Sequence, residues 1–253
     1  MVVYMAQRMI DLAQVSALQQ DWRRAAGAGG APAEASAAEA FRRCGDAVGV
    51  LSENLRRLGY PCPPMPVPPV LDEQVRAVEA ILAAPLPPII ALFWRNLGGL
   101  SFVDLEEYRH REFWDEHGLR GSYEFCDGVH VDACEAGWIE ALSLDFSDWK
   151  DDVDEDERQE DPFLLCLSPD GYHKDNISGD EPYGVYPGVS WLAAWENFSW
   201  TGAAQPRTAP PAAPDFLSYL RTAILECAGF PGLLGSAGFA DLRDRLLEGV
   251  PLF

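Results

Sequence analysis

The segment between Asp145 and Asp161 most constrains how this chain can fold, because it cannot enter a core. It reads DFSDWKDDVDEDERQED and contains ten carboxylates against one lysine and one arginine. Closely spaced like charges repel one another and lose too much hydration energy when they are buried. The segment must therefore lie in water or face a cationic partner, and the sequence leaves both possibilities open.

The overall composition indicates a folded, acidic protein. The chain has 253 residues, of which 48% are hydrophobic and 11% are aromatic, and this content supports a substantial core. Forty Asp and Glu residues outnumber nineteen Lys and Arg residues, which gives a formal net charge of −21. Such a charge repels nucleic acids and anionic membranes and attracts cationic protein surfaces.

The N-terminus and the cysteines favour a cytoplasmic location. The first residues, MVVYMAQRMIDLAQ, have neither a basic start nor a continuous apolar run, so no signal peptide is expected. The longest apolar stretch, PLPPIIALFW, is too short to span a membrane and is interrupted by prolines. Because the cysteines are scattered, we expect reduced thiols rather than a disulfide framework. The six are Cys44, Cys62, Cys126, Cys134, Cys166 and Cys227.

Helical periodicity marks both ends of the chain. The alanine- and glycine-rich segment 25–40 is expected to be a flexible connection between two helices, and the prolines of 60–69 predict an extended segment. Prolines before 89–94 and a glycine pair after it predict a short helix there. Asp215 is expected to cap a later helix that stops at Gly229. Apolar residues at three- and four-residue spacing predict longer helices at 4–24, 41–58, 71–82, 215–227 and 239–247.

The middle of the chain has the patterns of strands. The clearest is FLLCLS at 163–168, an apolar run that ends in a Ser-Pro-Asp-Gly turn. Alternating or β-branched residues predict further strands at 101–108, 128–134, 138–146 and 183–192. Helices followed by strands and again by helices predict an α+β fold rather than repeating βαβ units.

Three segments in this order resemble the SUKH superfamily, which contains bacterial immunity proteins related to a fungal cell-wall-synthesis regulator. Pro85–Phe102 is similar to its proline-led helix and glycine pair, Phe163–Val185 to its strand, PDG turn and second strand, and Pro214–Ile224 to its closing helix. A narrower likeness, to bacterial proteins with a GGFPG segment, covers 228–232. There Ala228 replaces the first glycine, which puts the loop geometry in question.

The resemblance implies a fold and a role. It implies a compact α+β domain, with a mixed or largely antiparallel sheet flanked by helices, which we place at 71–253. The apolar spacing places an N-terminal helical extension at 1–59 before this domain, and the prolines place a connector at 60–70. The resemblance also implies a non-enzymatic protein that binds and neutralises a cognate toxin, with no catalytic residues, cofactor or metal to carry over. Many such toxins are nucleases or deaminases, which tend to be basic and would fit the acidic excess seen here.

Acidic residues would speed the encounter with a basic toxin, and aromatic residues would anchor the complex. A solvated acidic loop and core tryptophans are the alternatives for these residues. A general protein-interaction scaffold with no toxin partner is the alternative function. The expected partner-binding residues are Asp148, Asp151, Asp152, Asp154, Glu155, Asp156, Glu157, Trp195 and Trp200.

Two patterns suggest metal binding without matching a known site. The acids of Asp152–Asp156 begin like a calcium loop, but Glu157 stands where the loop needs glycine and Phe163 where it needs glutamate. Cys126, His130 and Cys134 match no common zinc spacing, and an extended strand would hold them too far apart for one ion. We therefore expect no metal site.

A hydrolase is the remaining alternative, because polar residues gather after the strand at 163–168. His173 and Ser178 are the candidate pair, but no G-x-S-x-G motif accompanies them. Hydrogen-bonded turns are the simpler explanation for this loop. The whole cluster is His173, Lys174, Asn176, Ser178 and Tyr183.

Overall fold

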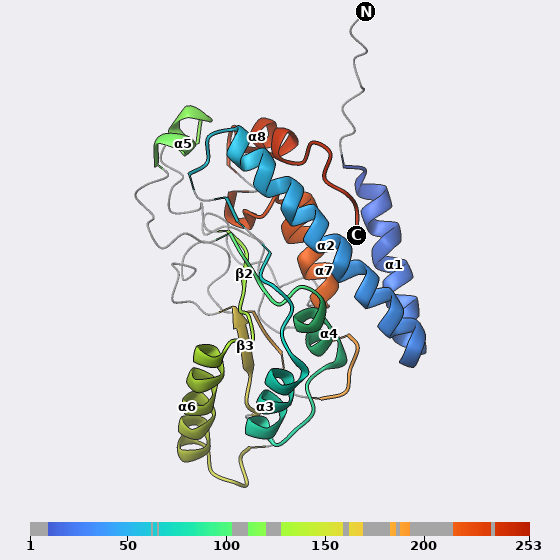
Figure 1. The fold of residues 1–253 in the computed structure, drawn as a ribbon, viewed down its shortest axis with the longest axis vertical. Coiled ribbons are helices and arrows are strands. Elements are labelled where there is room, and N and C mark those ends of the chain that lie inside the picture. Colours follow the sequence, from blue (N-terminus) through green and yellow to red (C-terminus); the bar gives the residue numbers. More distant parts are fainter. Residues whose placement is uncertain are drawn as a thin grey trace, which may run out of the picture.

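Helices make most of the described fold, and short antiparallel strand pairs complete it, which confirms the α+β class (Figure 1). The computed structural model describes residues 10–61, 63–64, 66–102, 111–119, 128–158, 162–168, 183–185, 188–192, 215–233 and 236–253. The helices are α1 (Leu12–Ala28), α2 (Gly30–Arg57), α3 (Asp72–Leu82), α4 (Pro88–Asn96), α5 (Arg111–Glu116), α6 (Ala136–Asp152), α7 (Phe216–Arg221) and α8 (Phe239–Leu246). A π-helical turn, η4 (Thr222–Glu226), and a 3₁₀ turn, η5 (Pro231–Leu233), follow α7. The strands are β1 (Leu100–Ser101), β2 (His130–Val131), β3 (Leu165–Ser168) and β4 (Tyr183–Val185).

The first two helices form a hairpin, and the prediction of a flexible connection at 25–40 is wrong. Gly29 and Gly30, with φ of +66° and +57°, interrupt the helical backbone and reverse the chain between α1 and α2. Alanine is the strongest helix former, and the small side chains of Ala33 and Ala37 are fully buried in the half of α2 that lies alongside α1 (Figure 1). Low sequence complexity here reflects close packing rather than flexibility.

Helix α2 lies at the centre of the hydrophobic core. Its Phe41 ring meets Phe93 of α4 edge-on at 5.4 Å, and Phe93 meets Phe216 of α7 at 5.1 Å. Buried residues from Val15 to Phe253 form one continuous cluster, so the N-terminal hairpin shares its core with the rest of the described chain. None of the helices in the described ranges is long and apolar enough to cross a membrane.

The strands pair locally and antiparallel. Ser101 of β1 lies opposite His130 of β2, and Leu165 of β3 lies opposite Val185 of β4. The backbone N–H of Asp132 donates to the Leu167 carbonyl at 2.7 Å and so links the two pairs.

The proline-rich segment is extended, as predicted, and reaches the start of β1. Val67 forms a bridge with Gly99 next to that strand. Gly98, with φ of +75°, passes so close to Pro68 that a Cβ atom would lie 2.0 Å from the Pro68 carbonyl oxygen. Only glycine therefore fits at position 98.

The strand predicted at 138–146 is wrong, because these residues form the first half of α6. Leu142 and Phe146 are buried one turn apart on α6, and α6 packs against α3 (Figure 1). Leu144 creates the apparent alternation with them, yet it is 62% exposed. The helical spacing of the buried residues, rather than the alternation, indicates the structure that forms.

The described residues from Asp215 onward follow the sequence prediction closely. Asp215 caps α7 by accepting a hydrogen bond from the Ser218 N–H at 3.1 Å, and the helical segment ends at Gly229 with φ of +88°. Its last turn, η4, has π-helical geometry that the sequence did not reveal. Ala228 adopts φ of +51°, a backbone conformation that glycine favours.

Candidate functional site

Helix α6 presents a row of exposed side chains on the face opposite its buried one. Glu140, Leu144, Asp148 and Asp151 follow one another at spacings of four, four and three residues, and all are exposed. Leu144 is the apolar member of this row. Because i, i+3 and i+4 positions share a helix face, these side chains form a continuous strip along α6.

A tight turn extends this strip beyond the end of α6. The Glu157 and Arg158 N–H groups both donate to the Asp154 carbonyl, at 2.9 and 3.1 Å, which folds residues 154–158 back on themselves. The helix and the turn together form what we call the acidic surface. Its carboxylates, all exposed, are Asp145, Asp148, Asp151, Asp152, Asp154, Glu155, Asp156 and Glu157.

The two basic residues of this segment, Lys150 and Arg158, stabilise the helix, and among the described residues neither forms an ion pair with an acid of the segment. The Arg158 guanidinium donates to the carbonyls of Lys150, at 2.7 Å, and Val153, at 3.1 Å, and it lies 5.7 Å from the Trp149 ring centroid. The Lys150 Nζ atom lies 4.5 Å from the Phe146 ring centroid. Arg158 thereby satisfies carbonyls at the C-terminal end of α6.

Within the described part of the chain, no carboxylate of the acidic surface forms an ion pair with a basic side chain. Other helices differ in this respect. On α2, Arg42 pairs with Glu39 at 2.7 Å and with Asp46 at 3.2 Å. The acidic surface is therefore a concentration of uncompensated charge among the described residues.

The position of these charges is unfavourable for α6 itself. Asp148, Asp151 and Asp152 occupy its last two turns, where the helix dipole favours cations. Asp148 also stands three and four residues before Asp151 and Asp152, spacings at which like charges destabilise a helix. A partner that supplies positive charge would relieve both effects.

The structure places only some of the predicted binding residues. All seven predicted acids belong to the acidic surface, whereas Trp195 and Trp200 lie outside the described residues. Trp191, from the same aromatic-rich segment, is half-buried and packs against the core. Four members of the polar cluster, His173, Lys174, Asn176 and Ser178, also lie outside the described residues, and Tyr183 begins β4.

A chain of hydrogen bonds joins Ser101, His130 and Asp132. The Ser101 Oγ atom lies 2.9 Å from His130 Nδ1, and His130 Nε2 lies 2.9 Å from Asp132 Oδ1. The other Asp132 oxygen, Oδ2, is buried and has no hydrogen-bond partner among the described residues, while the backbone carbonyl of Asp132 accepts from Trp94 Nε1 at 2.9 Å. Sequence reasoning missed this trio, because the pairing of β1 with β2 brings Ser101 to His130 across 29 residues. The even spacing of His130 and Asp132 was the available signal.

The cysteine and histidine pattern is not assembled as a metal site in the described residues. His130 bonds Ser101 and Asp132, and Cys134 is fully buried, which raises the pKa of its thiol to about 12. Cys126 lies outside the described residues. Across the described ranges, no three His, Cys, Asp or Glu side chains are grouped suitably for a metal ion.

Comparison with known proteins adds no further assignment. A scan against protein-family models finds no match to this chain, and searches of curated proteins and of solved structures find none either.

Proposed function

We propose that this chain is a cytoplasmic, non-enzymatic immunity protein that binds and neutralises a cognate basic toxin domain of the nuclease or deaminase type. The observation that carries the proposal is the acidic surface, whose exposed carboxylates lack described cationic partners. The SUKH-like segments support the same role. Inhibition would come from covering the toxin's cationic active site.

The composition of the acidic surface suits a protein interface. Protein interfaces combine a small apolar centre with a polar rim, and Leu144, 62% exposed, stands among carboxylates on a helix held by its buried face. Burial of a leucine side chain contributes about 1.5–3 kcal/mol. Carboxylates around it would steer a cationic partner and raise the rate of association.

The decisive experiment measures binding to the products of toxin-like genes that neighbour this one. The test variant neutralises Asp151, Asp152, Asp154 and Glu155 as Asn or Gln. Its control neutralises four exposed acids of α2, namely Glu34, Glu39, Asp46 and Glu53, and so changes the net charge equally. We expect the test variant to associate with the partner roughly tenfold more slowly than the parent at low salt. The association rate of the control should fall far less. An equal fall in association rate in the two variants would refute a role for the acidic surface.

Toxin neutralisation separates an immunity protein from a general interaction scaffold. Cells that express the cognate toxin should survive when this chain is co-expressed and should die when Leu144→Asp accompanies the four substitutions on the acidic surface. Binding without protection from any neighbouring toxin would favour the scaffold function. Neither result depends on a catalytic activity of this chain.

A second candidate, hydrolysis by an activated serine, is favoured by the hydrogen-bonded trio of Ser101, His130 and Asp132. If His130 Nε2–H donates to Asp132, then Nδ1 can take the Ser101 proton as Oγ attacks an ester carbonyl carbon. The ring would be reversed relative to serine proteases, where Nε2 faces the serine. A fluorophosphonate probe tests it: labelling that disappears in Ser101→Ala supports the candidate, and an unlabelled protein excludes it.

A further inference from the structure

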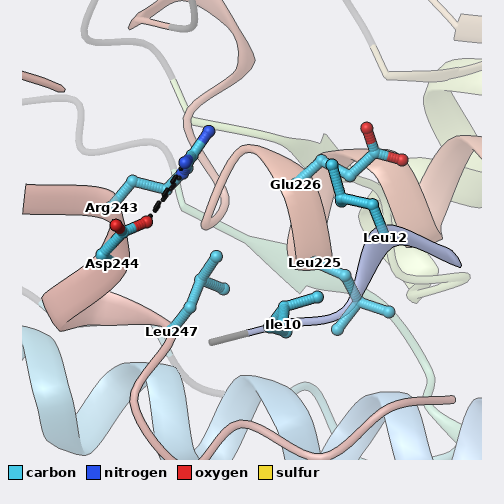
Figure 2. A pocket seen from close by; sticks show the side chains of 7 residues that line it. All are labelled: Ile10, Leu12, Leu225, Glu226, Arg243, Asp244 and Leu247. Atoms are coloured by element: carbon cyan, nitrogen blue, oxygen red, sulfur yellow. Dashed lines mark hydrogen bonds and ion pairs between the residues drawn. The ribbon is translucent and has the colours of Figure 1, made fainter. Parts of the chain in front are cut away.

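A cavity of about 360 Å³ lies where the start of α1 meets η4 and α8 (Figure 2). Four aliphatic side chains form its walls: Ile10, Leu12, Leu225 and Leu247. In Figure 2, Ile10, Leu225 and Leu247 lie below the charged groups, Leu12 lies beside Glu226, and Arg243 lies on the side opposite Glu226. The volume falls within the range of small-molecule sites, about 300–1,000 Å³.

The apolar end of the cavity is incompletely covered. Leu12 is 56% exposed, and Ile10 is only partly buried. A short alkyl chain would remove both side chains from water, and each added methylene would strengthen binding by about fourfold. The walls therefore favour an aliphatic ligand.

The polar end of the cavity carries a net negative charge. Arg243 donates through Nε and Nη2 to a single oxygen of its neighbour Asp244, at 3.3 and 3.1 Å, so this cation is already paired. Among the described residues, the one hydrogen bond that the Glu226 carboxylate accepts is a long one, 3.4 Å, from the Thr222 hydroxyl. Burial raises the pKa of Glu226, which means that its carboxylate is poorly solvated.

The backbone gives independent support for a site here. The π-helical turn η4 ends at Glu226 and places Leu225 and Glu226 together on the cavity wall. Such turns are rare within α-helices and occur frequently at functional sites.

We propose that this cavity binds a small molecule with an alkyl chain of about six carbons and a single ammonium group. The chain would lie against Ile10 and Leu12, and the ammonium group would pair with Glu226. This site is separate from the acidic surface on α6 and does not depend on the toxin-binding role. It would give the protein a second ligand of a different chemical class.

Isothermal titration with n-hexylammonium chloride tests the site. We expect saturable one-to-one binding that weakens by roughly fifteenfold for n-butylammonium, two methylenes shorter, and no binding of hexanoate. Glu226→Gln should weaken binding by about tenfold, and Leu12→Ser should weaken it while leaving the melting temperature near that of the parent protein. The matched controls are Glu248→Gln and Leu144→Ser, exposed positions outside the cavity, and both should bind as the parent does.

Three results would overturn the proposal. The first is the absence of saturable binding of n-hexylammonium to the folded parent protein. The second is equal binding of hexanoate, which would remove the assigned charge preference. The third is an equal loss in the cavity variants and in their controls, because this would indicate nonspecific attraction of a cation to an acidic protein.

Discussion

At the scale of single residues, the buried carboxylate of Asp215 ties the first helix of the chain to α7. It accepts hydrogen bonds from Trp22 Nε1 at 2.8 Å and from the Ser218 hydroxyl at 2.7 Å, and it faces Arg23 at 3.5 Å. Asp215→Ala should lower the free energy of unfolding by about 3 kcal/mol, because it leaves buried donors unsatisfied and removes the N-cap of α7. Urea denaturation measures this loss. Asp46→Ala, at an exposed ion pair, should change it by less than about 1 kcal/mol; similar losses in both variants would contradict the assignment.

Glu226 predicts a pH dependence of stability. Burial raises its pKa in the folded state above 4.5, so the folded chain holds this proton to higher pH than the unfolded chain does. The contribution of Glu226 to stability is therefore fully present below pH 4.5 and is lost as the pH rises through the folded-state pKa. Glu226→Gln mimics the protonated form. The urea midpoint of this variant should coincide with that of the parent at pH 4 and exceed it at pH 7. A difference between the two midpoints that stays constant across this pH range would refute the prediction.

At the scale of elements, the first half of α2 is a packed helix, and a matched pair of substitutions tests it. Ala37 is fully buried, whereas Ala35, two residues away, is exposed. Ala37→Leu should overfill the core and destabilise the protein by about 1–3 kcal/mol. Ala35→Leu should change stability by less than about 0.5 kcal/mol. Thermal melts of the two variants would be indistinguishable if this segment were instead a flexible connection.

Elements whose apolar pattern fits either a helix or a strand, but not both, were predictable from the sequence. Elements whose pattern fits both were not. Helices α3 and α8 follow their apolar spacing, α4 follows the prolines before it and the glycine pair after it, and β3 follows its apolar run. The prediction of a strand in place of α6 was wrong because Leu144, an exposed residue, completes a strand-like alternation with the buried residues Leu142 and Phe146. Local sequence does not say which apolar residues find a core, since that depends on packing from elsewhere.

The candidate sites divide in the same way. Exposure of the acidic surface follows directly from its charge density, which no core accepts. By contrast, the contact of Ser101 with His130 depends on strand pairing, and the cavity beside Glu226 depends on three segments far apart in the chain. These sites arise from long-range contacts, so no local pattern reveals them.

At the scale of the whole molecule, the net charge of −21 links stability to function. Repulsion among like charges destabilises a compact state and is screened by salt, with a Debye length of about 10 Å at 0.1 M. Added sodium chloride should therefore raise the melting temperature of this protein. The acidic surface should account for a large share of the effect, because its carboxylates lie near the unfavourable end of α6.

The variant that neutralises Asp151, Asp152, Asp154 and Glu155 should thus be more stable than the parent at low salt. Relief at the end of a helix is worth about 0.3–1 kcal/mol per charge, and the gain should shrink as salt is added. The α2 control should gain less, because it breaks ion pairs such as that of Arg42 with Glu39. Thermal melts from 10 mM to 500 mM sodium chloride measure both variants. A test variant that is more stable yet binds the partner more weakly would mean that the acidic surface is kept for binding at a cost in stability, whereas a less stable test variant would mean that these carboxylates support the fold.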